Sequence, residues 1–372
     1  MDKLKTIGLQ VFVLHLKVIY FFLKLLPSKN QVVFISRQSS VPSTDFELLI
    51  AELNKCRVPV VVLCKEMEKN KLGYLKYYFH ILKQLFVMAR SQVCVIDTYI
   101  IPVSVLNHKP NFKVIQIWHA IGKIKKSGYQ TLGKAGGRDE VLSRALKMHQ
   151  NYDYIVAGAQ YWNPYYCQSF NVTEDKLKNF GLPRMDYLLE KKADLQQEIR
   201  SKYPILDNGK KNILYAPTFR RTRSVGISSF LKDFDYENCN LILKFHPHDV
   251  HKEKVQDDRI LVIEEYSATQ LLPLAEYLVT DYSSIAFEAA LIDLKTLFYL
   301  NDYDKYLAEN GLNLDLKQAV PSLVTLDGEQ IHESINTGNY DFQTFRKFKQ
   351  LVLPKELGKS TKNIVTLIEE LL

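Results

Sequence analysis

What the sequence lacks excludes several common classes of protein. Its five cysteines form no C-x-x-C pair and stand at no spacing from histidine that suits a metal, so we expect free thiols in a reducing cytoplasm. No segment is low in complexity, which argues against a disordered chain. No G-x-G-x-x-G follows the first strand-like run, 31–36, so a nicotinamide cofactor is not expected.

An uninterrupted membrane-spanning run is also missing. The first 28 residues are long enough to cross a bilayer as a helix, but charged and polar residues interrupt them. Polar residues recur at every seventh position, at Lys3, Gln10, Lys17 and Lys24. They would form one stripe beside an apolar helical face, and no small-residue cleavage site of a signal peptide follows. The pattern predicts an amphipathic membrane-associating helix over 1–28; the alternative is a helix that packs on the first domain's own core.

Acidic residues are fewer than basic ones. The 372 residues include 49 Lys and Arg against 41 Asp and Glu, which gives a formal charge of +8. This moderate excess fits an anionic substrate or an anionic membrane surface, and it does not predict a nucleic-acid partner. The length and the hydrophobic content of 47% predict two domains, each with its own core.

Short apolar runs rich in Val and Ile alternate with helical patterns in two series. The first series of strand-like runs is 31–36, 58–64, 91–99, 112–120 and 152–158. The second series is 211–219, 240–248, 259–265, 277–283 and 295–300. Such alternation predicts an α/β fold with parallel sheets. We therefore expect two facing Rossmann-like domains, 29–190 and 191–372, with a terminal helix placed to pack back across their junction.

Polar groups gather where strands of the second series end. Thr218 and Arg220 follow one strand, and His246 and His248 follow the next. The carboxyl ends of parallel strands meet at one edge of a sheet, which is where open α/β sheets bind ligands. Guanidinium and imidazole groups at that edge can donate hydrogen bonds to a diphosphate.

A third strand end, in the stretch TDYSS, adds to this group. Asp281, Ser283 and Ser284 lie where the strand passes into a helical pattern, and Glu288 lies within that pattern. The first turn of a helix offers free backbone N–H groups to an anion, and a carboxylate there can accept hydrogen bonds from ribose hydroxyls. Two serines at a helix start are usually only a cap, but three such strand ends together predict a diphosphate site.

The first domain carries its candidate chemistry in the stretch IQIWHAIGKIKKSGYQ. His119 ends a strand there, and a neutral imidazole is well suited to take a proton from a hydroxyl near neutral pH. We interpret His119 as a general base; the alternative is a histidine packed beside Trp118. Lys123, Lys125 and Lys126 follow, and a solvated loop is the simpler interpretation of these lysines than one that steers a phosphorylated acceptor.

Five stretches together resemble the CDP-glycerol glycerophosphotransferase family of teichoic acid synthesis. They are IWHAIGKIKK, GLPRMDYL, YAPTFR, KFHPH and VTDYSSIAFEAA, in the family's order and spacing. In size and in its N-terminal helix the chain resembles the short, primase-like members. The resemblance implies a GT-B-like fold and a peripheral enzyme on the cytoplasmic side of the cell membrane. It also implies transfer of glycerol phosphate or ribitol phosphate from a CDP-alditol to an undecaprenyl-diphosphate-linked glycan, with release of CMP.

The resemblance assigns roles to individual residues. It makes His119 the base and places the diphosphate-binding groups at Arg220, His246, His248, Ser283 and Ser284. The family's G-x-P-R-x-D falls on Gly181, Pro183, Arg184 and Asp186, which makes Arg184 a further candidate for substrate binding. Ala120 stands where the family usually has Gly, and Glu288 where it commonly has Asp. The stretch YDKYLAENGLNLDL departs from the family's pattern and leaves glycerol versus ribitol open.

Two other classes of function stay open on the sequence. One is a GT-B glycosyltransferase with a nucleotide-sugar donor, which would share the fold and Glu288. The other is a membrane-binding scaffold without activity. No acidic cluster suited to Mg²⁺ stands out, although a Mg²⁺ ion carried in with the diphosphate donor stays open. The acceptor glycan, the number of units transferred and a homo-oligomeric state are equally open.

Overall fold

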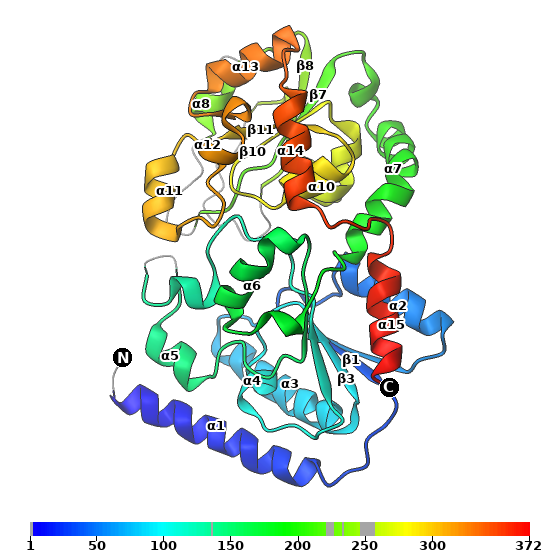
Figure 1. The fold of residues 1–372 in the computed structure, drawn as a ribbon, viewed down its shortest axis with the longest axis vertical. Coiled ribbons are helices and arrows are strands. Elements are labelled where there is room, and N and C mark those ends of the chain that lie inside the picture. The colour runs from blue at the N-terminus through cyan, green and yellow to red at the C-terminus, as the bar shows by residue number, and fades with distance from the viewer. Residues whose placement is uncertain (1–2, 135–136, 221–226, 233, 246–256) are drawn as a thin grey trace. The chain divides into compact units, whose positions relative to one another are not determined.

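The chain forms two compact units in a computed structural model that describes residues 3–134, 137–220, 227–232, 234–245 and 257–372 (Figure 1). The first unit is built from residues 1–121, 127–186 and 354–372. The second unit is built from residues 122–126 and 187–353.

A six-stranded parallel sheet forms the centre of the first unit. Its strands are β1 (Val32–Ser36), β2 (Val60–Cys64), β3 (Val93–Ile96), β4 (Lys113–Gln116), β5 (Tyr154–Val156) and β6 (Leu177–Lys178). Their order across the sheet is β2-β1-β3-β4-β5-β6, and the neighbouring pairs are parallel. β1 and β3 are buried along their whole length, which explains why their sequences are apolar runs without polar alternation.

Several helices of the first unit begin with side-chain caps. The helices of this unit are α1 (Lys3–Leu23), α2 (Thr44–Lys55), α3 (Lys71–Arg90), α4 (Ile101–Val105), α5 (Glu140–Ala145), α6 (Asn163–Phe170), the start of α7 (Pro183–Lys202) and α15 (Ser360–Glu370). Ser43 Oγ accepts the N–H of Phe46 at 3.4 Å, and Asn70 Oδ1 accepts that of Gly73 at 2.7 Å. α15 lies beside α2 (Figure 1), so the end of the chain belongs to the first unit.

α1 packs on the first unit by one face. Its side chains Val13, Leu16 and Tyr20 are buried. Lys109 Nζ donates to the carbonyl oxygens of Leu26 at 2.5 Å and Ala89 at 2.8 Å, and it thereby joins the ends of α1 and α3. This face of α1 therefore packs on the core of its own domain, as the alternative interpretation expected. Contact of the helix with a membrane stays a prediction. Across the described ranges, no helix combines the length and apolar composition that a membrane span needs.

The second unit is built around another six-stranded parallel sheet. Its strands are β7 (Lys211–Tyr215), β8 (Cys239–Leu243), β9 (Ile260–Leu261), β10 (Tyr277–Thr280), β11 (Lys295–Tyr299) and β12 (Val324–Thr325). The order is β12-β11-β10-β7-β8-β9, again with parallel neighbours. The helices are the rest of α7, α8 (Ser228–Leu231), α9 (Ala268–Leu271), α10 (Ile285–Leu291), α11 (Tyr303–Asn310), α12 (Leu316–Ala319), α13 (Gly328–Thr337) and α14 (Phe342–Val352).

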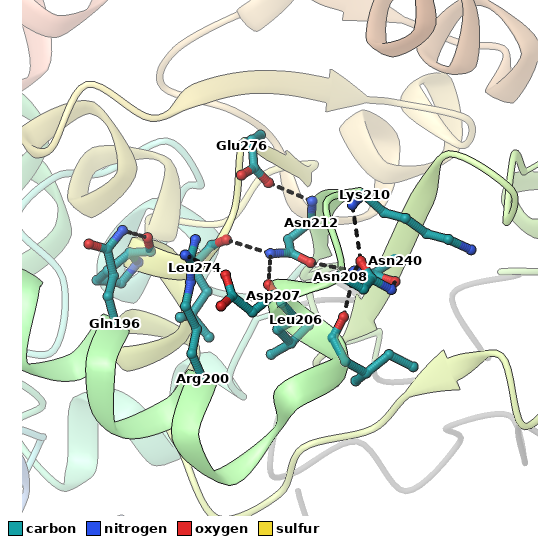
Figure 2. Close-up of polar contacts among 12 residues, drawn as sticks. Gln196, Arg200, Leu206, Asp207, Asn208, Lys210, Asn212, Asn240, Leu274 and Glu276 are labelled. Carbon is teal, nitrogen blue, oxygen red and sulfur yellow. Dashed lines mark hydrogen bonds and ion pairs between the residues drawn. The ribbon is translucent and has the colours of Figure 1, made fainter.

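An asparagine network fixes the start of β7 and β8 (Figure 2). Asn212 Nδ2 donates to the carbonyl oxygens of Leu206 at 2.9 Å and Leu274 at 3.2 Å, and Asn240 Nδ2 donates to Asn212 Oδ1 at 2.8 Å. Buried amides cost free energy unless they are paired, so this network favours one register of the two strands. It lies at the amino ends of the strands and leaves their carboxyl ends for other side chains.

Each sheet reverses its strand order at one point. In the first sheet β1 is the neighbour of β3, and in the second sheet β7 is the neighbour of β10. Ligands of open α/β sheets bind beyond the carboxyl ends of strands at such a switch point. Gln38 and Asp97 follow β1 and β3, while Thr218 and Asp281 follow β7 and β10. The fold therefore brings polar side chains to one switch point in each unit.

The α/β class with parallel sheets is confirmed, and the strands are shorter than their apolar runs. β6 and β12, of two residues each, were not predicted. The sequence placed the domain boundary near 190, whereas the units divide within α7, between Asp186 and Tyr187. Nothing in the sequence indicated that residues 122–126 join the second unit.

Candidate active site

Trp118 and His119 lie on a strained turn directly after β4. Trp118 has φ of 56°, in the left-handed region that residues other than glycine rarely adopt. Gln116 Oε1 accepts the N–H of Trp118 at 2.8 Å, and Gln116 Nε2 donates to the carbonyl oxygen of Thr98 at 3.0 Å. The ring of Trp118 lies 4.2 Å from the imidazole of His119 between centroids. Buried Gln116 thus holds a turn that presents His119 as an exposed side chain.

The Nδ1 edge of His119 faces residues that follow β1 and β3. Gln38 Nε2 lies 3.1 Å from Nδ1, and the backbone carbonyl oxygen of Asp97 lies 3.4 Å from it. Gln38 Nε2 donates to Nδ1 when that nitrogen carries no proton, and Nε2 then carries it; when Nδ1 instead carries the proton and donates to the Asp97 carbonyl, Nε2 is the basic nitrogen of the ring. In this second tautomer the exposed His119 has the free Nε2 that a general base requires.

Asp97 adds a titratable carboxyl group at this switch point. Burial raises the pKa of Asp97 to about 6, although hydrogen bonds with Ser36 and Thr98 lower it. A carboxyl group that titrates near neutral pH, in the residue whose carbonyl contacts a candidate base, is a feature of acid–base sites. Sequence reasoning missed Asp97 because it lies inside the apolar run 91–99.

Asp281 joins the ends of β7 and β10 in the second unit. Its Oδ1 accepts the N–H groups of Thr218 at 2.8 Å and Tyr282 at 2.6 Å. Its Oδ2 accepts a hydrogen bond from Arg220 Nη2 at 2.9 Å. In this structure Asp281 positions the other residues of the switch point, and its own contact with substrate stays a prediction.

Arg220 is buried among carboxylates and aromatic rings, with 3% of its surface exposed. Its Nε and Nη2 donate to Asp302 at 2.9 and 3.0 Å, and its Nη1 donates to the carbonyl oxygen of Thr218 at 2.6 Å. Burial lowers the pKa of Arg220, but Asp281 and Asp302 outweigh burial and raise it above its ordinary value. Arg220 is therefore a permanently charged centre of this site, and its contact with a diphosphate stays a prediction.

Two buried hydroxyl groups near Arg220 have no hydrogen-bond partner in the part of the chain that the structure describes. They are Thr218 Oγ1 and the hydroxyl of Tyr282. The ring of Tyr282 lies 5.4 Å from the guanidinium carbon of Arg220 and stacks on Tyr306, with centroids 3.9 Å apart. Buried polar groups are normally paired, so these hydroxyls suit the polar atoms of a ligand. Thr218 was predicted as a site residue, while Tyr282 was not.

A short segment after His119 brings lysines into the second unit. The backbone N–H of Lys126 donates to the carbonyl oxygen of Gly311 at 3.1 Å. The backbone N–H of Asn313 donates to the carbonyl oxygen of Ile124 at 2.7 Å. Lys125 and Leu312 form an antiparallel bridge between these contacts. The segment is therefore a strand-like addition to the loop between α11 and α12.

The interpretation of these lysines as a solvated loop is wrong for Lys123, which is 3% exposed. Burial lowers the pKa of Lys123 to about 7. Burial also lowers the pKa of Lys125, to about 8, while Asp281 raises it and Arg220 lowers it further. The ammonium group of Lys125 makes no hydrogen bond or ion pair with any residue that the structure describes. Lys125 thus adds a cation to the switch point of the second sheet.

The two serines of TDYSS lie where α10 begins. Ser284 is the residue before the helix and makes no side-chain cap, while Ser283 Oγ accepts the N–H of Ile285 at 3.4 Å. Both serines are partly exposed. Glu288 is buried within α10, with 3% of its surface exposed. The hydroxyls of Ser283 and Ser284 are accessible to a donor molecule, as the prediction requires. The contacts of Ser283, Ser284 and Glu288 with the donor stay predictions.

Arg184 and Asp186 make contacts inside the first unit. Arg184 donates from its N–H to Asp45 Oδ1 at 2.9 Å and from Nε to Asp45 Oδ2 at 2.8 Å. Asp186 Oδ2 accepts the N–H of Thr361 at 2.7 Å and so caps α15. The charged residues of GLPRMD thus join α2, α7 and α15, a role that the prediction of Arg184 as a substrate-binding residue did not include.

His246 and His248 lie outside the described residues. Within the described ranges, no group of three His, Cys, Asp or Glu side chains is placed to hold a metal ion. At the switch point of the second sheet, the described hydrogen-bond donors are a buried arginine, a lysine and several hydroxyls, and Asp281 and Asp302 form ion pairs with the arginine. Such groups donate hydrogen bonds and suit an anion.

Comparisons with known proteins point to one group of enzymes. A family model described as CDP-Glycerol:Poly(glycerophosphate) glycerophosphotransferase matches residues 18–370. The chain is 28% identical over 366 residues to the teichoic acid ribitol-phosphate primase of Bacillus spizizenii, which covers 94% of this chain and 93% of the relative. It is 29% identical over 301 residues to the teichoic acid glycerol-phosphate primase of Bacillus subtilis, with 79% and 77% covered.

A solved structure of the wall teichoic acid polymerase TagF shares the fold. The TM-score is 0.73 at 17% identity, and the match covers 100% of this chain and 98% of that chain. At this identity the likeness concerns the arrangement of the backbone.

Proposed function

The chain belongs to the CDP-glycerol:poly(glycerophosphate) glycerophosphotransferase family, and from this membership we propose that it transfers glycerol phosphate or ribitol phosphate from a CDP-alditol to an undecaprenyl-diphosphate-linked glycan and releases CMP. A ribitol-phosphate primase and a glycerol-phosphate primase are similar to it at 28% and 29% identity. Identity therefore does not choose between the two alditols.

The observation that carries the proposal is the pair of basic side chains, Arg220 and Lys125, at the switch point of the second sheet. Asp281 and Asp302 hold Arg220 there by ion pairs. Lys125 lies near Arg220, and no carboxylate among the described residues forms an ion pair with Lys125. The hydroxyl of Thr218, which has no partner among the described residues, and the partly exposed hydroxyl of Ser284 add neutral donors. A diphosphate needs this combination of positive charge and hydrogen-bond donors.

In the proposed reaction His119 acts on the acceptor. An acceptor hydroxyl gives its proton to Nε2 of His119 as its oxygen forms a bond to the β-phosphorus, the one that bears the alditol. The bond from that phosphorus to the bridging oxygen breaks, and its electron pair leaves with CMP. Lys125 and the hydroxyl groups of the second unit stabilise the charge that develops on CMP. These side chains stabilise the charge. A Mg²⁺ ion, where the donor carries one, would enter the site together with the donor.

The proposal includes a place on the cytoplasmic side of the cell membrane. The outward face of α1 carries Ile7, Val11, Leu14, Val18 and Phe21, each between 50% and 60% exposed. Their spacing of three and four residues makes one apolar stripe on the helix, which is the pattern of an interfacial helix. A lipid-linked acceptor would be met at such a surface.

A transfer assay with separate donors tests the function. The full chain is offered CDP-glycerol, CDP-ribitol or a UDP-sugar with a lipid-linked disaccharide, and CMP release and product mass are measured. Transfer of one alditol phosphate with equimolar CMP is expected. Turnover of the UDP-sugar in preference to both CDP-alditols would instead favour a GT-B glycosyltransferase, and failure to bind CMP at all would favour a scaffold.

A further inference from the structure

The apolar stripe of α1 is bordered on one side by a cavity lined with lysines. The cavity has a volume of about 490 Å³ and lies between α1, the residues after α4 and the loop after α5. Figure 1 shows α1 along the outside of the first unit, beside these elements. The lining of the cavity includes Lys17, Tyr20, Phe21, Lys24, Asn107 and Lys147.

The lysines stand between the two apolar faces of α1. Lys17 and Lys24 are two helical turns apart, on the border between the buried Tyr20 and the exposed Phe21. The wall of the cavity that α1 forms is therefore charged along the border between the packed face and the outward face of the helix. A ligand bound there would have its polar end against the lysines and any apolar part beside the stripe.

The opposite wall is a loop whose backbone is held in an unusual conformation. Lys147, His149 and Asn151 have φ of 48°, 62° and 66°, in the left-handed region. Asn151 Nδ2 donates to the carbonyl oxygens of Val103 at 3.0 Å and Leu106 at 2.8 Å, which fixes the loop to the end of α4. The surroundings thus maintain a strained loop that places Lys147 on the cavity.

The charge of the cavity is not balanced by acidic side chains. None of the residues that line it is Asp or Glu. Lys17, Lys24 and Lys147 make no side-chain hydrogen bond or ion pair with any residue in the described part of the chain. Three ammonium groups around one cavity repel one another, and a ligand with several negative oxygens would relieve that repulsion. Asn107 and the lysine Nζ groups would donate hydrogen bonds to such oxygens.

We propose that this cavity binds the terminal phosphate or diphosphate headgroup of a membrane lipid, with Lys17, Lys24 and Lys147 on the phosphate oxygens. The proposal goes beyond the proposed function, because the diphosphate of a lipid-linked glycan acceptor lies between the lipid and the glycan and is not a terminal group. Charge complementarity selects the phosphate, and the adjoining stripe of Ile7, Val11, Leu14 and Val18 selects a lipid as its carrier over a free anion.

Vesicle binding without any donor tests the site. Phosphatidylcholine vesicles carry either phosphatidylglycerol, phosphatidic acid or a polyprenyl phosphate, at amounts adjusted to equal surface potential. The full chain should bind the two lipids with terminal phosphates about tenfold more tightly than phosphatidylglycerol, and inorganic pyrophosphate should compete. This test measures vesicle binding and not transfer. A protein without transfer activity would contradict the proposed function, and its lipid preference could still be measured.

The decisive variant is Lys17→Gln, Lys24→Gln and Lys147→Asn, since asparagine tolerates the left-handed backbone at position 147. It should lose the tenfold preference. The charge-matched control is Lys69→Gln, Lys76→Gln and Lys83→Gln, whose side chains are exposed before and along α3, and it should keep the preference. Equal loss in both variants, or retention in the first, would overturn the site. If the triple variant does not fold, Lys17→Gln alone must reduce the preference.

Two further arms separate the sources of the phosphate. Leu14→Gln with Val18→Gln should abolish vesicle binding for every lipid while pyrophosphate still binds the protein in solution. Pyrophosphate binding in solution together with no preference among vesicles would assign the cavity to a free anion and overturn the lipid assignment. A wild-type protein that binds neither would overturn the proposal altogether.

Discussion

His119 is the residue on which the proposed chemistry depends most directly. His119→Ala removes the proton acceptor and should lower kcat by about 10²–10⁴-fold, as expected for a lost general base. The affinity for the CDP-alditol should change by no more than a few-fold, because the base acts on the acceptor. Transfer rates and a separate CMP-binding titration check this, with the exposed His15→Ala as control. A variant that keeps more than a tenth of the wild-type rate would remove His119 from this role.

Lys125 should make donor binding depend on pH. With a pKa of about 8, the ammonium group is charged below that pH and loses its proton as the pH rises. The KM for the CDP-alditol should therefore increase above pH 8. Lys125→Ala should raise KM by about tenfold or more at pH 7, as expected for a lost charged hydrogen bond.

Lys125→Arg keeps the charge at every pH tested and should flatten the profile. Lys126→Ala, at the neighbouring position, serves as control and should retain it. The role of Lys125 would be refuted by an arginine variant whose KM rises with pH as steeply as that of the wild type.

Among the elements, α2 and α7 are joined by the ion pair of Arg184 and Asp45. Asp45 is 2% exposed, so Arg184→Ala leaves a buried carboxylate without its partner. Loss of one member of a buried pair costs about 3–5 kcal/mol, and the free energy of unfolding should fall accordingly. Urea unfolding measures this, with the exposed pair of Arg144 and Glu140 as the matched control: Arg144→Ala should unfold close to wild type. If Arg184→Ala is as stable as the wild type and only its KM for the donor is raised, Arg184 binds substrate and does not stabilise the fold.

How far the sequence predicts the elements depends on whether the signal is local. β1, β3 and β10 are short buried strands, and their apolar runs suffice to find them. Thr218 and Asp281 were predicted together because both follow strands of one series. The pair of Arg184 and Asp45 has no local signal, since 139 residues separate its members. Lys125 was missed because its environment comes from α11 and α12, far along the chain.

Across the whole molecule, the first unit is closed by the end of the chain. Residues 354–372 belong to it, α15 lies beside α2, and Asp186 caps α15 through the N–H groups of Ser360 and Thr361. Deletion of residues 354–372 should therefore destabilise the first unit selectively. Hydrogen exchange should increase in α2 and β1 while β7 and β10 stay protected. Equal loss of protection in both units, or none in either, would show that α15 does not close the first unit.

The return of α15 to the first unit has a consequence for how the protein is made. A ribosome releases residues 187–353 before residues 354–372, so the second unit can acquire its fold while the first still lacks its last helix. Domains generally fold in the order of synthesis. Here the order of completion is reversed, and the surface of α2 that α15 later covers stays open to chaperones until residues 354–372 have left the ribosome.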